Sequence, residues 1–187
     1  MYLIELDSAV GDGDLGITME KGFLAAAALA AAMSESRPGS ILMKAGIEIA
    51  KVAPSTMGTL MGTGLMRGGK AVIGKDSLNA SDMVDFFAGF LQGVTDRGKA
   101  KAGEKTILDV LIPMVDAMRA YKGTDITEVL GWAKKGAIQG IENEKTMMSQ
   151  HGKAAVFREK TIGVKDPGSE AVLLMIGACY ESMKNRT

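Results

Sequence analysis

The chain is divided into helix-length segments by short breaks rich in glycine, proline and serine, and this pattern restricts the fold more than any other feature. Alanine, leucine and methionine fill the segments, and the alternation of polar and apolar residues that is typical of strands is hard to find. Aromatic residues make up only 5% of the chain. The pattern predicts an all-α protein, a bundle or barrel of antiparallel helices with short connections.

Seven helices are expected, bounded by cap residues, glycines and prolines. Ser40, Ser81 and Ser169 are the predicted N-caps of three of them. No linker or repeat divides the chain, so residues 1–187 are predicted to form one domain. An irregular segment is expected at residues 151–168, and the seven helices at residues 17–33, 41–52, 58–73, 82–96, 105–121, 125–149 and 169–184.

The charges of the chain balance, with 22 Lys and Arg against 22 Asp and Glu. This balance excludes a general nucleic-acid binder. The single cysteine, Cys179, excludes an internal disulfide and favours a reducing compartment. The longest apolar stretch, residues 23–33, is too short to cross a membrane, and the acidic stretch near the start leaves no room for a signal peptide. We therefore expect a cytoplasmic protein without a membrane or nucleic-acid partner.

Three aspartates, Asp7, Asp12 and Asp14, lie within eight positions near the N-terminus. Two unit charges about 4 Å apart repel by about 4 kcal/mol at an effective dielectric of about 20, and a bound cation would reverse that energy. Mg²⁺ is the natural candidate, because it binds a few carboxylates together with waters and substrate phosphates. A turn at Gly13 followed by a helix cap at Asp14 is the alternative, although it leaves Asp7 and Asp12 without a role. The residues alone leave both interpretations open.

Glycine is unusually frequent for a helical protein, with 24 residues. Several glycines lie at predicted helix starts, where free N–H groups and the helix dipole favour anions such as phosphate. Residues 64–71 and 98–106 come close to a phosphate-binding loop, but the first lacks the final hydroxyl and the second misses the spacing by one residue. Close helix packing is the preferred explanation for Gly62, Gly64, Gly68 and Gly69.

Four motifs follow one another along the chain. The first, D-x4-D-G-D-x-G, covers residues 7–16, and the second, G-T-L-M-G, covers residues 58–62. The third, R-G-K-A-x2-G-E-K-T-I-L-D, covers residues 97–109, and the fourth, T-I-G-V-K-D-P-G-S, covers residues 161–169. In this order they resemble the nucleotide-binding L subunit of dihydroxyacetone kinase, and the resemblance extends over nearly the whole chain.

The resemblance implies a fold and a set of site residues. The family fold is a barrel of eight antiparallel helices with the nucleotide at one rim, and the seven predicted helices fit it if an N-terminal helix is missing. Asp7, Asp12 and Asp14 would hold two Mg²⁺ ions that bridge the phosphates of ADP or ATP. No catalytic residue is implied. The implied nucleotide contacts are Leu15, Gly16, Ile17, Thr18, Thr56, Met57, Gly98, Thr106, Ile107, Lys153, Asp166, Pro167 and Gly168.

The function that the resemblance implies is that of an ADP/ATP-binding subunit in a multicomponent kinase for dihydroxyacetone or a related small hydroxyketone, as in glycerol metabolism. Mg-nucleotide would relay a phosphoryl group from a phosphohistidine protein of the phosphotransferase system to a substrate held on a separate K subunit. The chain would be active only with these partners, and a homodimer is left open.

Three departures from the family pattern indicate a divergent paralogue. Leu15 replaces a histidine, Met57 lies in an altered phosphate loop at residues 55–58, and Lys153 replaces an arginine. Lysine keeps the positive charge and loses the two-pronged contact of arginine with phosphate. Two alternatives stay open: the nucleotide domain of an ATP-dependent kinase of the fatty-acid kinase type, and a non-catalytic regulatory module.

Overall fold

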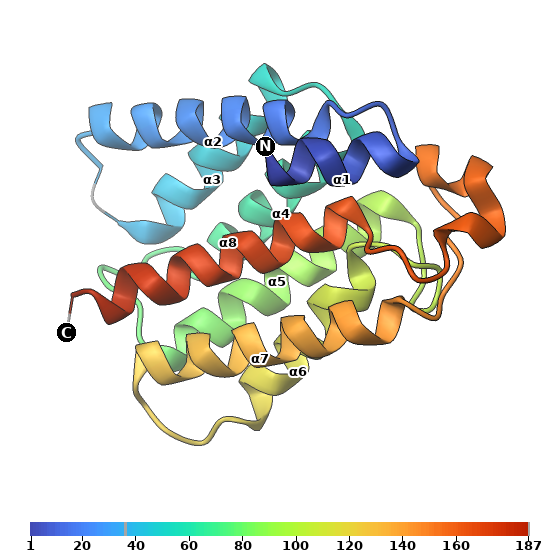
Figure 1. Ribbon diagram of the computed structural model, residues 1–187. Coiled ribbons are helices and arrows are strands. Elements are labelled where there is room, and N and C mark those ends of the chain that lie inside the picture. Colours follow the sequence, from blue (N-terminus) through green and yellow to red (C-terminus); the bar gives the residue numbers. More distant parts are fainter. Residues whose placement is uncertain (36, 187) are drawn as a thin grey trace. The chain divides into compact units, whose positions relative to one another are not determined.

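The protein is all-helical, as predicted. The computed structural model describes residues 1–35 and 37–186, and within these ranges it contains helices and no strand (Figure 1). The elements in chain order are α1 (Tyr2–Val10), α2 (Leu15–Ala32), α3 (Pro38–Val52), α4 (Thr56–Ala71), α5 (Ala80–Gly98), α6 (Leu108–Ala120), α7 (Ile126–Glu144), the 3₁₀-helix η1 (Lys153–Thr161) and α8 (Pro167–Lys184).

The helices belong to two compact units. The first unit contains residues 1–16 and the chain from residue 100 onward, and the second contains residues 17–99. The first therefore holds α1, α6, α7, η1 and α8, and the second holds α3, α4, α5 and most of α2. The organisation of residues 1–187 as one domain stays a prediction.

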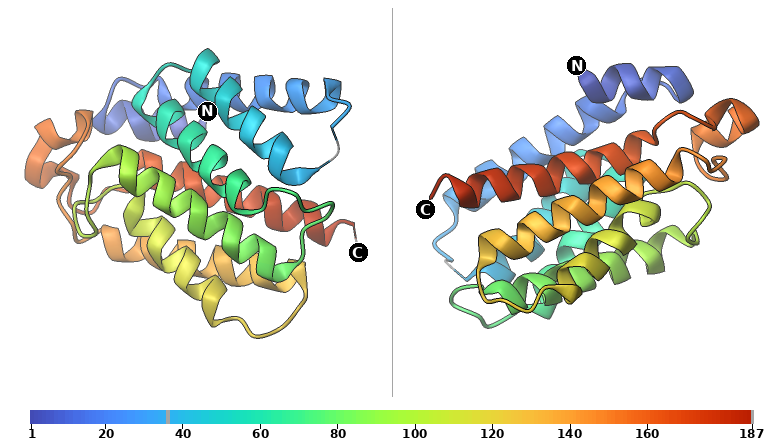
Figure 2. Two further views of the ribbon diagram at one scale, coloured as in Figure 1. Left: turned by 180° about the vertical axis from the view of Figure 1, so that it is seen from behind. Right: turned by 60° about the horizontal axis from the view of Figure 1, so that its bottom comes forward.

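In the second unit, α3, α4 and α5 pack side by side in antiparallel order (Figure 2). The backbones approach closely where glycines face each other: a Cβ added to Gly46 would lie 2.5 Å from the carbonyl oxygen of Gly62. A Cβ on Gly64 would lie 2.6 Å from the Phe90 ring. Further Cβ clashes at Gly68 and Gly69 confirm that these glycines serve close helix packing.

In the first unit, α7 packs antiparallel to both α6 and α8 (Figure 2). A Cβ on Gly140 of α7 would lie 2.6 Å from the carbonyl oxygen of Asp109 on α6. Gly131 is at the other end of α7, and a Cβ added there would lie 3.3 Å from the Tyr180 ring of α8. Leu111, Met114, Leu130 and Ile176 are fully buried between these helices. This arrangement brings the starts of α6 and α8 to the same end of the unit as the end of α7.

One helix, α1, lies before residue 17, where no helix is predicted, so the described residues contain eight α-helices against seven predicted. A helix of nine residues is marginal on its own and depends on packing. Its packing is visible at Ile4, whose side chain lies against Gly16 so closely that a Cβ there would be 2.6 Å from Ile4 Cγ1.

Several helices begin earlier than predicted. Asn79 and Asp82 form a reciprocal capping box at α5, and the Asp166 side chain caps α8. Arg37 is the N-cap residue of α3, which has proline in its first turn. The predicted caps at Ser40, Ser81 and Ser169 are therefore wrong, because each lies inside the helix that it was expected to start. The irregular segment at residues 151–168 contains η1.

Among the described residues, one helix is long and apolar enough to cross a membrane by length and composition. It is α2, an 18-residue helix with a mean hydropathy of 1.4. A core helix or a signal sequence meets the same two criteria.

Candidate functional site

Three carboxylates meet at the end of α1. Asp7 lies on α1, and Asp12 and Asp14 lie in the loop between α1 and α2. One oxygen from each carboxylate lies within 4.8 Å of the others, and Asp12 and Asp14 are exposed while Asp7 is half-buried. Because Mg²⁺ binds through a few carboxylates and keeps positions for water and phosphate oxygens, this solvent-open oxygen set fits that ion. The structure thus brings together all three predicted metal ligands.

Two glycines give the acidic loop its shape. Gly13 has a φ of 74°, in the left-handed region that glycine adopts without strain. A Cβ on Gly11 would collide with Oδ1 of Asp7 and would lie 2.9 Å from the Asp7 carbonyl oxygen. The loop can therefore fold back over Asp7 only because residue 11 has no side chain.

Asp7 also caps the following helix. Its Oδ2 atom accepts a hydrogen bond from the Leu15 backbone N–H over 3.1 Å, in the first turn of α2. This is the kind of capping bond that the alternative interpretation assigned to Asp14. The two interpretations are compatible in the structure, since Asp7 can use Oδ2 for the cap and Oδ1 for a cation.

Lys153 brings a positive charge to the acidic loop. It is the first residue of η1, and its ammonium forms an ion pair with Asp12, 141 positions earlier in the chain. Both side chains are well exposed. The pair offsets part of the repulsion among the three carboxylates.

The loop before α6 is fixed by Asp109, in the first turn of that helix. Its two carboxylate oxygens accept hydrogen bonds from the backbone N–H groups of Gly103 at 2.6 Å and Thr106 at 2.8 Å. Gly103 has a φ of 88°, as the tight turn requires. Thr106 and Ile107, both predicted nucleotide contacts, are thereby held just before the positive end of a helix dipole.

The start of α8 lies next to this loop. Asp166 caps α8 by accepting a hydrogen bond from the Ser169 N–H at 2.9 Å, and Pro167 occupies the first helical turn. The Ser169 hydroxyl donates to the Thr106 carbonyl over 3.3 Å. Two groups of predicted contacts, Thr106 with Ile107 and Asp166 with Pro167 and Gly168, are therefore neighbours in the first unit.

Buried charges lie behind these two loops. Glu144, at the end of α7, is completely buried, and its Oε1 accepts a hydrogen bond from the Asp166 N–H at 2.8 Å. Burial raises the pKa of Glu144 to about 7 and that of Asp166 to about 6, because the charged carboxylates lose hydration. Lys105 is 2% exposed, and burial lowers the pKa of its ammonium, while the charges of Glu144 and Asp166 oppose that shift.

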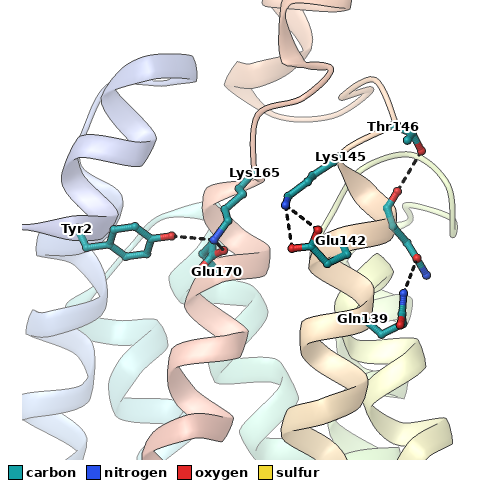
Figure 3. Close-up of polar contacts among 8 residues, drawn as sticks. Tyr2, Gln139, Glu142, Lys145, Thr146, Lys165 and Glu170 are labelled. Carbon is teal, nitrogen blue, oxygen red and sulfur yellow. Dashed lines mark hydrogen bonds and ion pairs between the residues drawn. The ribbon is translucent and has the colours of Figure 1, made fainter.

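A second polar cluster connects α1 to α8 (Figure 3). The Lys165 ammonium lies 2.6 Å from the buried carboxylate of Glu170 and donates a hydrogen bond to the Tyr2 hydroxyl at 3.3 Å. These contacts, of which the bond to Glu170 is the strongest, raise the pKa of Lys165. Because Tyr2 is the first residue of α1, the cluster fixes the helix that carries Asp7.

The other predicted contacts lie between residues 15 and 98, near the end of the first unit at residue 16 or within the second unit. Leu15 and Gly16 begin α2 in the first unit, and Ile17 and Thr18 continue that helix in the second. Within the second unit, Thr56 and Met57 form the first turn of α4, and Gly98 ends α5. A Cβ on Gly98 would lie 3.4 Å from Leu60 of α4, so these residues share one end of the α4–α5 pair. Nucleotide contact stays a prediction for every residue named from the sequence.

Sequence reasoning missed three buried residues of the site, Lys105, Glu144 and Glu170, and the half-buried Lys165. Lys105 carried a partial signal, because it lies in a stretch that nearly matches a phosphate-binding loop. Glu144 and Glu170 carried none, since a glutamate in a predicted helix is ordinarily exposed.

Comparisons with known proteins agree with the resemblance. The profile of the family described as the DAK2 domain matches residues 9–181. The ADP-binding subunit DhaL of the PEP-dependent dihydroxyacetone kinase of Escherichia coli is 30% identical over 177 residues, which cover 94% of this chain and 84% of that protein. The ADP-binding subunit DhaL of PEP-dependent dihydroxyacetone kinase 1 of Listeria innocua is 31% identical over 183 residues, covering 96% and 86%.

A solved structure shows the same fold. The dihydroxyacetone kinase from C. freundii in complex with AMP-PNP and Mg²⁺ superposes with a TM-score of 0.69 at 22% sequence identity. The match covers 97% of this chain and 30% of that longer one, so the chain corresponds to less than a third of the solved protein.

Proposed function

The chain belongs to the DAK2 domain family, and on that premise we propose that it is the ADP- or ATP-binding subunit of a multicomponent kinase. The substrate is dihydroxyacetone or a related small hydroxyketone. Relatives that carry the name of ADP-binding subunit and align over 84% and 86% of their own length support this proposal. The observation that carries it is the set of three carboxylates within 4.8 Å, inside the region that the family profile matches.

Asp7, Asp12 and Asp14 would hold Mg²⁺, and we propose two ions, as the resemblance implies. When bound, Mg²⁺ supplies charge neutralisation for nucleotide phosphates. The chain's own residues do the positioning: Asp7 orients the start of α2, and Lys153 adds a positive charge beside Asp12. In the first unit, the other proposed nucleotide contacts are Leu15, Gly16, Thr106, Ile107, Asp166, Pro167 and Gly168.

Partners complete the proposed activity. A separate K subunit holds the substrate, and a phosphohistidine protein of the phosphotransferase system is the phosphoryl source, which places the protein in the cytoplasm. Support comes from the relatives, which are PEP-dependent kinase subunits by name.

Calorimetry tests the binding part of the proposal. ADP is titrated into the purified chain with Mg²⁺ and then with EDTA, and we expect binding only when Mg²⁺ is present. The variant Asp12→Asn/Asp14→Asn should lose at least tenfold in affinity for Mg-ADP. Asp76→Asn/Asp116→Asn removes the same charge from exposed positions outside the site and should bind normally. Binding of ADP with equal affinity in EDTA, or by the Asp12→Asn/Asp14→Asn variant, rejects the proposal.

A phosphoryl-transfer assay tests the choice of donor. The chain is combined with a K subunit and dihydroxyacetone, and either ATP alone or a phosphohistidine protein with ADP is supplied. We expect product only with the phosphohistidine protein. Product from ATP alone would support the ATP-dependent alternative instead.

A further inference from the structure

We propose that Lys105 is a positioning residue of the nucleotide site: its buried ammonium anchors the loop of residues 103–107, and it does not bind phosphate itself. This inference rests on the proposed function, because it names what holds two of the proposed nucleotide contacts, Thr106 and Ile107, in place.

The direction of the Lys105 side chain separates it from a phosphate-binding lysine. In a phosphate-binding loop the lysine of the G-K-T motif reaches the nucleotide phosphates. Lys105 lies in a similar Gly-Glu-Lys-Thr sequence, yet it is only 2% exposed. Its ammonium donates hydrogen bonds to two backbone carbonyl oxygens, that of Met147 at 3.1 Å and that of Thr161 at 2.5 Å.

These two bonds join segments that are distant in the sequence. Met147 lies in the turn after α7, and Thr161 is the last residue of η1. Two further hydrogen bonds strengthen the connection: the Gln150 N–H donates to the Glu104 carbonyl at 3.1 Å, and the Ser149 N–H donates to the Thr161 hydroxyl at 2.9 Å. The ammonium is thus a common anchor for the 103–107 loop, the turn after α7 and the end of η1.

The backbone at Lys105 requires an anchor. Its φ is 55°, in the left-handed region where a residue with a Cβ is strained. Such a conformation persists only where surrounding contacts fix it. Charge favours the anchor as well, since the neighbouring acids Glu144 and Asp166 stabilise the buried ammonium.

The residue that this anchor positions, Thr106, follows Lys105 directly in the chain. The N–H group of Thr106 donates to Asp109 at 2.8 Å, and its carbonyl accepts the Ser169 hydroxyl at 3.3 Å. Loss of the Lys105 bonds would release the loop on one side while Asp109 still held the other. The result would be a displaced pair of nucleotide contacts in a folded protein.

The test compares Lys105→Met with Lys101→Met, which removes an exposed lysine two residues before that loop. Affinities for ADP and for AMP are measured by calorimetry with Mg²⁺, and Mn²⁺ binding without nucleotide is measured by electron paramagnetic resonance. In Lys105→Met we expect ADP and AMP to weaken by the same factor, tenfold or more, with Mn²⁺ affinity within twofold of the wild-type value. Lys101→Met should match the wild-type chain throughout.

A backbone measurement accompanies these affinities. Hydrogen exchange at the Thr106 and Ile107 amides, without nucleotide, should be at least tenfold faster in Lys105→Met. If that variant fails to fold, Lys105→Gln, which keeps an N–H donor and removes the buried charge, enters the same comparison.

Two results would overturn the inference. If ADP affinity and amide exchange are unchanged in Lys105→Met, the anchor is dispensable. If Lys105→Met loses ten times more affinity for ADP than for AMP, Lys105 contacts phosphate directly. If the wild-type chain binds neither nucleotide, the proposed function fails together with this inference. If the wild-type chain binds ADP and Lys105→Met binds it equally well, this inference is overturned and the proposed function is not.

Discussion

At the scale of single residues, the carboxyl group of Glu144 is titratable and lies where solvent does not reach it. It is fully buried, and its Oε2 has no hydrogen-bond partner among the described residues. Burial raises its pKa from 4.5 to about 7. A carboxyl group with a higher pKa in the folded state binds its proton more tightly there, so it contributes stability at low pH. That contribution is lost as the pH rises from about 4.5 through about 7.

Glu144→Gln should remove this pH dependence. Between pH 5 and pH 8, ionisation of Glu144 should lower the unfolding free energy of the wild-type chain by about 2 to 3 kcal/mol, whereas a neutral amide does not ionise. Urea unfolding at the two pH values measures the difference, with the exposed Glu142→Gln as control. A variant that is less stable than the wild type at pH 8 would contradict the prediction, since it would show that the attraction between Glu144 and Lys105 outweighs the loss of hydration.

A second prediction at this scale concerns Gly11. In Gly11→Ala the new methyl group would occupy the space of Asp7 Oδ1, so the Asp7 carboxylate or the loop backbone must shift, which changes the arrangement of the three carboxylates. We expect Mn²⁺ affinity, measured by paramagnetic resonance, to fall at least tenfold while the far-ultraviolet circular dichroism is unchanged. Gly177→Ala in α8 is the control, because a Cβ there meets nothing within 4 Å. Full Mn²⁺ affinity in Gly11→Ala would contradict this account of the loop.

The residues of the site differ in how far the sequence could predict them. Asp7, Asp12 and Asp14 lie within eight positions, so local chain geometry alone keeps them together. The contact of Lys153 with Asp12 spans 141 positions, and only the family resemblance placed both in one site. Lys105 and Glu144 were missed because burial of a charged side chain depends on the packing of distant segments, which no local pattern records.

At the scale of elements, α1 is the helix that must be held in place for Asp7 to reach the loop. One of its attachments is the contact of Tyr2 with Lys165, which is paired in turn with Glu170 (Figure 3). Glu170 has 4% of its side chain exposed, whereas Lys165 has 37%. Removal of Lys165 would therefore leave a buried carboxylate without its partner, which is more costly than the absence of both charges.

Lys165→Met is expected to lower the unfolding free energy by about 1 to 2 kcal/mol, and Tyr2→Phe by less than about 0.5 kcal/mol. The double variant Lys165→Met/Glu170→Gln should recover part of the loss. Urea unfolding gives these values, and hydrogen exchange should show faster opening of α1 in Lys165→Met. If the double variant is as unstable as Lys165→Met, the unpaired Glu170 is not the cause.

The sequence predicted which segments form helices better than it predicted where those helices begin. Seven of the α-helices lie where alanine- and leucine-rich segments predicted them, because segments of 13 to 19 residues carry strong local signals. The nine-residue α1 was missed, since its stability comes from Tyr2 and Ile4 packing on distant residues. The N-caps lie two or three residues before the predicted serines: asparagine and aspartate compete with serine for the cap of α5 and α8, and proline begins the first turn of α3.

At the scale of the whole molecule, the two units carry different parts of the predicted site. The three aspartates lie in the first unit, together with Trp132 on α7, which is the one tryptophan of the chain. Fluorescence of Trp132 therefore reports the unfolding of the unit that holds the proposed metal ligands, whereas circular dichroism at 222 nm reports the helices of both units.

Mg-ADP should stabilise the first unit through linked binding. A ligand present at 100 times its dissociation constant adds about 2.7 kcal/mol to folding, which corresponds to a rise of about 5–10 °C in the midpoint for a chain of this size. We expect the fluorescence transition to shift by this amount with Mg²⁺ and ADP together, and EDTA should abolish the shift. Asp12→Asn/Asp14→Asn should show no shift with either addition. A shift that persists in EDTA would mean that the nucleotide binds without the metal, and the three carboxylates would then need another role.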